Sequence, residues 1–171
     1  MKIREAKKED AEVIAKIHVQ AWRSGYKEIM PDEYLQSLSI ATRTKQWLDA
    51  LSAPGPGINL VIEQNGILSG FCVYGPARDK DLSNDNAGEL VALNILPNAW
   101  GMGLGTEFVK HVIASAFNHN WSSLYLWVIK ENGRARRLYE SMGFEYDGNE
   151  KTDSWLTDCE LHELRYMHKL G

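Results

Sequence analysis

The segment Glu89–Gly105, with the sequence ELVALNILPNAWGMGLG, decides how this chain folds. Its first half, Glu89 to Leu96, is a nearly continuous apolar run, which is typical of a strand that is covered on both faces. Its second half holds three alternate glycines, and a helical pattern follows from about Gly105 to Phe117. A strand, a glycine-rich turn and a helix in this order indicate an α/β domain with a parallel crossover at the centre of its sheet.

The remainder of the chain extends this pattern in both directions. Before the segment we expect a short strand, two helices, and two strands joined by the tight turn Asn65-Gly66, with a further helix start at Pro31-Asp32-Glu33. After it we expect a strand, a helix that ends at Gly143, and the last strands. The expected elements span 3–6, 8–21, 42–51, 59–64, 68–74, 89–96, 105–117, 124–129, 133–142, the stretch from 144 onward, and 161–169. This order, βααβββαβαββ, predicts an α/β sandwich with a mixed central β-sheet flanked by helices.

Length and composition restrict the class of protein. With 171 residues and 44% hydrophobic content, the chain fits a single domain that spans 1–171. A formal net charge of −4 and scattered Lys and Arg residues argue against a nucleic-acid partner. We find no apolar run of about eighteen residues that would indicate a membrane span. The first residues lack the apolar stretch of a secretion signal, so we expect a cytoplasmic protein.

The cysteines and histidines do not form a recognisable chemical site. Cys72 and Cys159 lie in apolar or strand-like surroundings and form neither a CxxC pair nor a Cys/His ligand spacing. We therefore interpret both as reduced and structural, with a catalytic thiol as the alternative. No common spacing relates His111, His119, His162 and His168. The sequence predicts no metal.

The turn Trp100-Gly101-Met102-Gly103-Leu104-Gly105 lies between the apolar strand and the helix. Main-chain N–H groups and a helix N-terminus converge there, where no side chain blocks approach, and this predicts an anion site. A plain tight turn is the alternative. A dinucleotide fold needs an acidic residue about twenty positions on, and Ser123 to Leu126 offers none. The chain lacks the GKS or GKT of a nucleotide-hydrolysing P-loop, so we expect a different pyrophosphate ligand.

A second motif, Asn132–Phe144, reads NGRARRLYESMGF. Asn132 can act as an N-cap that also presents its amide to a ligand. Tyr139 lies two helical turns further on, nearly on the same face of the helix, so that one face could view one ligand. The alternatives are a cap alone for Asn132 and a buried aromatic residue for Tyr139.

Together the two motifs resemble the GCN5-related N-acetyltransferase (GNAT) family. The first resembles the acetyl-CoA signature Q/R-x-x-G-x-G/A, with Trp100 in place of Gln or Arg. The second matches N-x-x-A-x-x-x-Y-x-x-x-G-F at every fixed position. The resemblance covers 89–144 by motif and the remainder by the order of elements. It implies a GNAT-like three-layer sandwich and an acetyl-CoA-dependent N-acetyltransferase.

The resemblance also implies which residues bind acetyl-CoA. In the family, main-chain N–H groups of the turn contact the pyrophosphate, and the strand before the turn splays and pairs with the cofactor. The residues expected at the cofactor are Leu93, Asn94, Ile95, Trp100, Gly101, Met102, Gly103, Leu104, Gly105, Thr106, Asn132 and Ala135.

Acetyl transfer to an amine needs a neutral nucleophile, a polarised thioester carbonyl and a proton for the departing thiolate. Deprotonating an alkylammonium ion of pKa about 10.4 costs roughly 4.6 kcal/mol at pH 7. By analogy with the family, Glu89 is the base and Tyr139 reprotonates the thiolate, while a main-chain N–H near Asn94 or Ile95 polarises the carbonyl. The alternative for Glu89 is a solvated carboxylate at a strand edge.

The resemblance places the acceptor pocket at Trp22, Tyr26 and Met30. His18, Trp22 and Tyr26 recur at helical spacing, which a buried helix face explains equally well.

A run of acidic residues bears on the acceptor. Asp79, Asp81 and Asp85 form either a solvated face or an acidic rim that attracts a cationic amine. The predicted acceptor is the primary amine of a small molecule (an amino acid or a polyamine) or of a peptide N-terminus, acetylated by direct attack. A non-catalytic acyl-CoA-binding sensor or regulatory module is the alternative function, and a homodimer is one option for assembly.

Overall fold

The computed structural model describes residues 1–53, 55–83, 85–154 and 159–171. The strands are β1 (Lys2–Glu5), β2 (Ile58–Gln64), β3 (Ile67–Pro76), β4 (Ala87–Ile95), β5 (Ser123–Ile129), β6 (Glu145–Asp153) and β7 (Leu161–Lys169). The helices are α1 (Ala11–Gly25), α2 (Asp32–Ser37), α3 (Ile40–Ser52), α4 (Leu104–Asn118) and α5 (Gly133–Ser141). No helix within these ranges combines the length and apolar character needed to cross a membrane.

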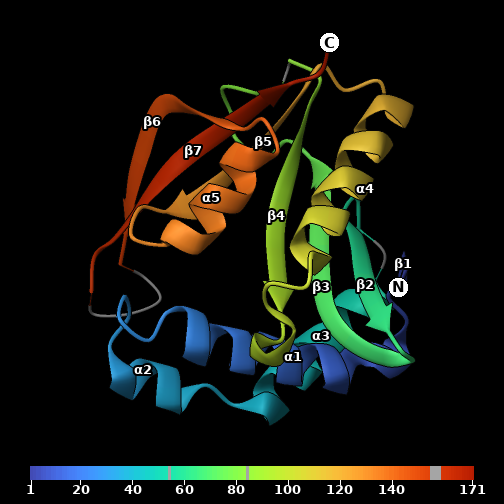
Figure 1. Cartoon of the computed structure of the whole chain (residues 1–171), viewed down its shortest axis with the longest axis vertical. Coiled ribbons are helices and arrows are strands. Elements are labelled where there is room, and N and C mark those ends of the chain that lie inside the picture. The colour runs from blue at the N-terminus through green and yellow to red at the C-terminus, as the bar shows by residue number, and fades with distance from the viewer. Residues whose placement is uncertain (54, 84, 155–158) are drawn as a thin grey trace.

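The strands form one mixed sheet in the order β1-β2-β3-β4-β5-β7-β6. The neighbours pair antiparallel except β4 and β5, which are parallel and are connected through α4. Helices α4 and α5 lie on one face of the sheet, and α1 and α3 lie on the opposite side (Figure 1). The predicted three-layer sandwich with a central parallel crossover is therefore confirmed.

Each face of the sheet has its own apolar core. On the α4 face, Phe108 of α4 packs with Leu126 of β5. On the α1 face, Ile17 of α1 packs with Phe71 of β3, and side chains of α3 complete the cluster. Because successive strand residues point to opposite faces, this burial on both sides explains the apolar runs of the central strands.

Strands β4 and β5 pair over only part of their length. Their paired residues are Ala87 with Ser123, Gly88 with Leu124 and Glu89 with Tyr125, whereas β4 continues to Ile95 and β5 to Ile129. The two strands therefore diverge beyond Glu89 (Figure 1). This gap also explains why β4 is buried over its first four residues but only half-buried over most of its second half.

The divergence leaves main-chain groups of β4 without a strand partner. Leu96 N–H donates to Ser69 O at 2.8 Å, on the β3 side. Hydrogen-bonding directions alternate along an antiparallel strand. The N–H groups of Leu93 and Ile95 consequently point away from β3, into the gap between β4 and β5.

The connections follow the predicted turn chemistry. Asn65 and Gly66 join β2 and β3 with φ angles of 52° and 79°, which is the left-handed pair that a tight two-residue hairpin turn requires. Helix α1 is longer than expected. It continues to Gly25, because the edge of one ring of the His18–Trp22 pair meets the face of the other, with centroids 5.1 Å apart. This contact keeps the last turn of the helix packed. The helix start expected at Pro31-Asp32-Glu33 is confirmed, because the short helix α2 begins at Asp32.

Candidate active site

Two cavities meet in the gap between β4 and β5. The first, of about 360 Å³, lies against the glycine-rich turn and is called the turn cavity. The second, of about 210 Å³, lies between β5, β7 and the end of α1, and is called the β7 cavity. The residues that line both are Tyr26, Leu93, Asn94, Asn132, Ala135 and Tyr139. A molecule in one cavity can therefore touch a molecule in the other.

The residues expected at the cofactor gather around the turn cavity. All of them except Met102 line it. Met102 is 52% exposed and stands between two glycines that turn the chain, so its side chain points to solvent. The residues of the motif, apart from Met102, therefore share the wall of one cavity.

The three glycines of the turn are required for different reasons. Gly101 and Gly103 have φ angles of 77° and 82°, a left-handed conformation that glycine adopts without strain, and a Cβ on either would meet no atom within 4 Å. A Cβ on Gly105 would instead lie 2.9 Å from Cδ2 of Leu138 on α5. Gly105 thus permits close packing of α4 on α5 and also belongs to the wall of the turn cavity.

The first turn of α4 presents donors to the turn cavity. Its N-cap, Gly103, has no side chain that could cap the helix, and Leu104, Gly105 and Thr106 line the cavity. The first N–H groups of a helix have no partner inside the helix. Together with the positive end of the helix dipole, these groups form a site suited to an anion.

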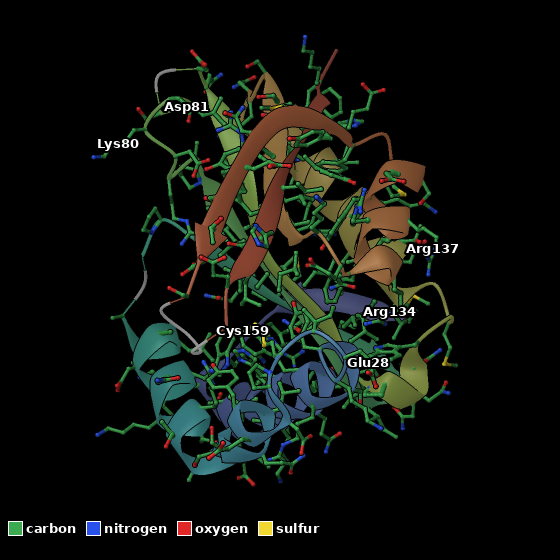
Figure 2. All side chains as sticks on the ribbon, turned by 90° about the vertical axis from the view of Figure 1, so that its left-hand side faces the viewer. Glu28, Lys80, Asp81, Arg134, Arg137 and Cys159 are labelled. Carbon is green, nitrogen blue, oxygen red and sulfur yellow. The ribbon has the colours of Figure 1, made fainter. Side chains whose placement is uncertain are left out.

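Trp100 and Arg134 form a pair at the edge of the turn cavity. The indole Nε1 of Trp100 donates to Ile95 O at 2.8 Å and so fixes the end of β4. The guanidinium carbon of Arg134 lies 3.4 Å from the centroid of the Trp100 ring. Among the described residues that line this cavity, Arg134 alone carries a positive side-chain charge. Figure 2 shows Arg134 on α5, nearer than Arg137 to the N-terminal helices.

The second motif places its polar residues at the junction of the cavities. Asn132 caps α5, because its Oδ1 accepts from Ala135 N–H at 3.3 Å, as predicted. Tyr139 is 8% exposed, and its hydroxyl makes no hydrogen bond to the residues that the structure describes. Burial raises the pKa of Tyr139. The phenol is therefore protonated at neutral pH and can donate a hydrogen bond or a proton.

The expected acceptor residues line the β7 cavity. Trp22, Tyr26 and Met30 all belong to its wall, and the rings of Trp22 and Tyr26 meet edge-on with centroids 5.3 Å apart. They also pack into a cluster with Leu35 and Leu161. Both interpretations of their helical spacing, a buried face and a pocket wall, therefore describe the same residues.

Glu89 is not brought to either cavity. It is 3% exposed, and its two carboxylate oxygens accept from Arg78 at 2.8 Å each, while Tyr125 donates a further bond at 2.9 Å. Burial by itself would raise the pKa of Glu89, but the Arg78 guanidinium and the Tyr125 hydroxyl outweigh it and hold the pKa below its ordinary range. These contacts give Glu89 the environment of a structural ion pair.

Two of the three aspartates that we considered as an acidic rim are also paired. Arg165, with a side chain 6% exposed, bonds Asp79 at 3.1 Å and Asp81 at 2.9 Å, and it contacts Asp147 at 2.7 Å. Asp79 further accepts from Trp127 Nε1 at 3.0 Å. In Figure 2, Asp81 lies at the end of the molecule away from Arg134. These charges tie the loop before β4 to β6 and β7 and do not face the turn cavity.

Some wall residues were missed from the sequence. Arg134 stands inside the second motif, and a basic residue in the first turn of a helix that faces an anion site was a usable signal. Trp127, Asp153 and Glu163 line the β7 cavity. Glu163 pairs with Ile129 in the sheet and shares its face, but β7 mixes apolar and charged residues, so its sequence carried no clear signal for Glu163.

Comparisons with known proteins agree with this arrangement. The model of the acetyltransferase (GNAT) family matches residues 12–144. The uncharacterised N-acetyltransferase YuaI of Bacillus subtilis (strain 168) is 35% identical over 130 residues, which make up 76% of this chain and 72% of that protein. A probable N-acetyltransferase of Mycobacterium tuberculosis is 28% identical over 160 residues, 91% of this chain and 84% of that protein.

Solved structures share the fold. The PaiA N-acetyltransferase from Thermoplasma acidophilum, in complex with coenzyme A, has a TM-score of 0.76 at 18% identity and covers 99% of this chain and 98% of its own. The acetyltransferase YncA from Salmonella typhimurium, with acetyl-CoA, has a TM-score of 0.73 at 22% identity and covers 100% of this chain and 94% of its own. Since the family model spans most of the chain and the relatives carry the same description, this chain belongs to the acetyltransferase (GNAT) family.

Proposed function

We propose that this chain transfers the acetyl group of acetyl-CoA directly to the primary amine of a small molecule or of a peptide N-terminus. The observation that carries the proposal is the junction of two cavities at Tyr139. The turn cavity receives the donor and the β7 cavity receives the acceptor, so that both can meet without a covalent enzyme intermediate. The structures from T. acidophilum and S. typhimurium, solved with coenzyme A and acetyl-CoA, support the choice of donor.

The turn cavity fits the chemistry of acetyl-CoA. The uncapped first turn of α4 offers N–H groups to a pyrophosphate, and Arg134 adds a positive charge. The free strand edge at Leu93 and Ile95 offers main-chain groups to an extended amide chain such as pantetheine, in the way that a peptide adds to a sheet edge. When bound, acetyl-CoA supplies an activated thioester.

The chain offers a group for the charge that develops during transfer and another for the proton. Ile95 N–H, turned into the gap, can donate to the carbonyl oxygen on which negative charge grows. The amine attacks in its neutral form, and the Tyr139 phenol, kept protonated by burial, can give its proton to the leaving sulfur. The proton that the amine nitrogen loses passes to solvent, from which Tyr139 is protonated again. Both residues line the turn cavity, and Tyr139 also lines the β7 cavity.

The position of Glu89 changes the prediction for its substitution. In Glu89→Gln, the loss of the charge-assisted bonds to Arg78 should lower the free energy of unfolding by about 1–3 kcal/mol, measured by urea denaturation at neutral pH. The pKa of Glu89 is held below its ordinary 4.5, so this contribution is present above that value and is lost as the pH falls through the folded-state pKa. The difference between the two proteins should therefore vanish in acid.

A matched exposed pair serves as the control for Glu89. Glu107→Gln removes the contact with Lys110 on the surface of α4 and should change the unfolding free energy by less than about 0.5 kcal/mol. A folded Glu89→Gln variant should keep the wild-type pH profile of turnover. Turnover that collapses near neutral pH and recovers at alkaline pH would instead identify Glu89 as the base.

Substitution of Arg134 tests the donor side. Arg134→Gln should weaken the binding of CoA by about fivefold, or roughly 1 kcal/mol, because the charge next to the pyrophosphate is lost but is partly screened by solvent. The difference should shrink as salt is added. Arg137→Gln makes the same change in charge on the same helix, outside the cavity wall, and should leave the affinity measured by calorimetry unchanged. Equal affinities for the two variants would remove Arg134 from the donor site.

The proposed reaction is tested by supplying acetyl-CoA with a panel of primary amines and hydroxyl compounds while free thiol is detected. We expect thiol release that depends on an amine, with the acetylated amine identified by mass spectrometry. Preferential use of hydroxyl compounds contradicts the proposal. Tight binding of CoA without release on any acceptor also contradicts it and supports the non-catalytic module.

A further inference from the structure

The β7 cavity has a charge that acetyl transfer alone does not require. Its wall contains the carboxylates of Asp153 and Glu163, and no Lys or Arg is among the described residues that line it. The apolar part of the wall includes the aromatic residues Trp22 and Trp127. At the inner end, the buried Tyr139 belongs to the walls of both cavities, and its hydroxyl bonds no described residue.

The chain already places one ammonium group at the edge of this cavity. Lys151 Nζ lies 4.3 Å from the centroid of the Trp127 ring and 3.8 Å from Glu163 Oε2. A cation over an aromatic face and next to a carboxylate is a favourable arrangement. The contact with Glu163 is long for a hydrogen bond, and the Lys151 side chain is 45% exposed, so this ammonium is only loosely held.

Glu163 is placed to receive a cation from within the cavity. It lies on β7 opposite Ile129, the last residue of β5, and therefore near the start of α5, where Asn132 marks the junction. Its side chain is 21% exposed. Burial raises the pKa of Glu163, and the negative charge of Asp153 raises it further. The Lys151 ammonium lowers this pKa but does not outweigh the other two effects. A second cation would stabilise the carboxylate of Glu163 further.

We propose that the β7 cavity selects small amines that carry no carboxylate, with the ammonium group held by Glu163 and the Trp127 ring and the body packed against Trp22 and Met30. This inference rests on the proposed function and narrows its acceptor. A cavity of about 210 Å³ is smaller than the roughly 300 Å³ at which drug-sized pockets begin. An amino acid would bring its carboxylate beside Asp153 and Glu163, which repel it, while the nearby Lys151 ammonium already faces Glu163.

A matched pair of acceptors tests this selection. Phenethylamine and phenylalanine differ by one carboxylate, and we expect kcat/KM to favour phenethylamine by about tenfold or more. Titration of each compound into the protein saturated with CoA, followed by calorimetry, should give the same order of affinity without relying on turnover.

Two substitutions assign the preference to named residues. Glu163→Gln should raise KM for phenethylamine by about tenfold, change kcat less, and reduce the preference over phenylalanine. Lys151→Met removes the competing ammonium and should lower that KM by about threefold. Glu145→Gln, an exposed carboxylate on β6 outside the cavity wall, is the control and should change neither value.

The outcomes separate the inference from the proposed function. Equal use of phenylalanine and phenethylamine, or a preference that Glu163→Gln leaves intact, overturns the inference while acetyl transfer stands. If Glu163→Gln does not fold, the Lys151→Met variant decides the question. A higher KM for phenethylamine in that variant overturns the inference. If no amine is acetylated, the proposed function fails, and equal calorimetric affinities for the two compounds would overturn the inference as well.

Discussion

Replacing Tyr139 with Phe is expected to lower the turnover number by about 10²-fold, which is a usual contribution of one general acid. The substitution keeps the ring, whose centroid lies 6.0 Å from that of Phe144, and removes only the hydroxyl. Because this hydroxyl bonds no described residue, the free energy of unfolding should change little. The KM for acetyl-CoA should also stay close to that of the wild type.

The reference for Tyr139 is a tyrosine outside the cavities. Tyr74 is 3% exposed, and its hydroxyl forms a hydrogen bond of 2.8 Å with Ser115. Tyr74→Phe should therefore lower stability by about 1 kcal/mol and leave turnover unchanged. If Tyr139→Phe behaves in the same way, losing stability but not turnover, Tyr139 is a core residue and another group protonates the sulfur.

Replacing Gly103 with Val is expected to weaken CoA binding by about 10²-fold or more. At a φ of 82°, a β-branched residue is strained, so the turn should shift and the N–H groups of the first turn of α4 should lose their alignment. Each hydrogen bond to a charged group contributes about 1.5–3 kcal/mol, so the loss of two such bonds weakens CoA binding by about 10²-fold or more. The added side chain also projects into open space beside the cavity.

Gly66 provides a control for the backbone strain that a substitution at Gly103 introduces. Gly66, in the turn between β2 and β3, has a φ of 79° and open space around its Cβ position. Gly66→Val should cost similar conformational free energy, and its CoA affinity by calorimetry should equal that of the wild type. Gly103→Val with the same affinity as Gly66→Val would show that the turn does not hold the pyrophosphate.

Local chemistry made much of the fold and of the turn cavity predictable. The hairpin at Asn65-Gly66, the cap at Asn132 and the glycine-rich turn each depend on neighbours within a few residues, and the structure has each where the sequence indicated it. The apolar run from Glu89 likewise indicated the central strand.

Contacts between distant segments were not predictable in the same way. Asp79 and Asp81 could be weighed only as a surface group, because their partner Arg165 is more than eighty residues away in the chain. The family resemblance implied that Glu89 is a base, whereas in the structure Arg78 and Tyr125 donate hydrogen bonds to its carboxylate. The role of a polar side chain depends on the groups that it contacts, and these groups are known only once the fold is known.

The central claim is that donor and acceptor are bound together and that the amine attacks the thioester directly. Cys72, the buried thiol of β3, lies outside both cavity walls, and burial raises its pKa, which does not suit a covalent carrier of the acetyl group. The most direct test is an initial-velocity study in which acetyl-CoA and phenethylamine, or another amine that the panel shows to be acetylated, are both varied. Intersecting double-reciprocal lines, the sign of a ternary complex, are predicted; parallel lines, the sign of an acetylated enzyme, would contradict the account.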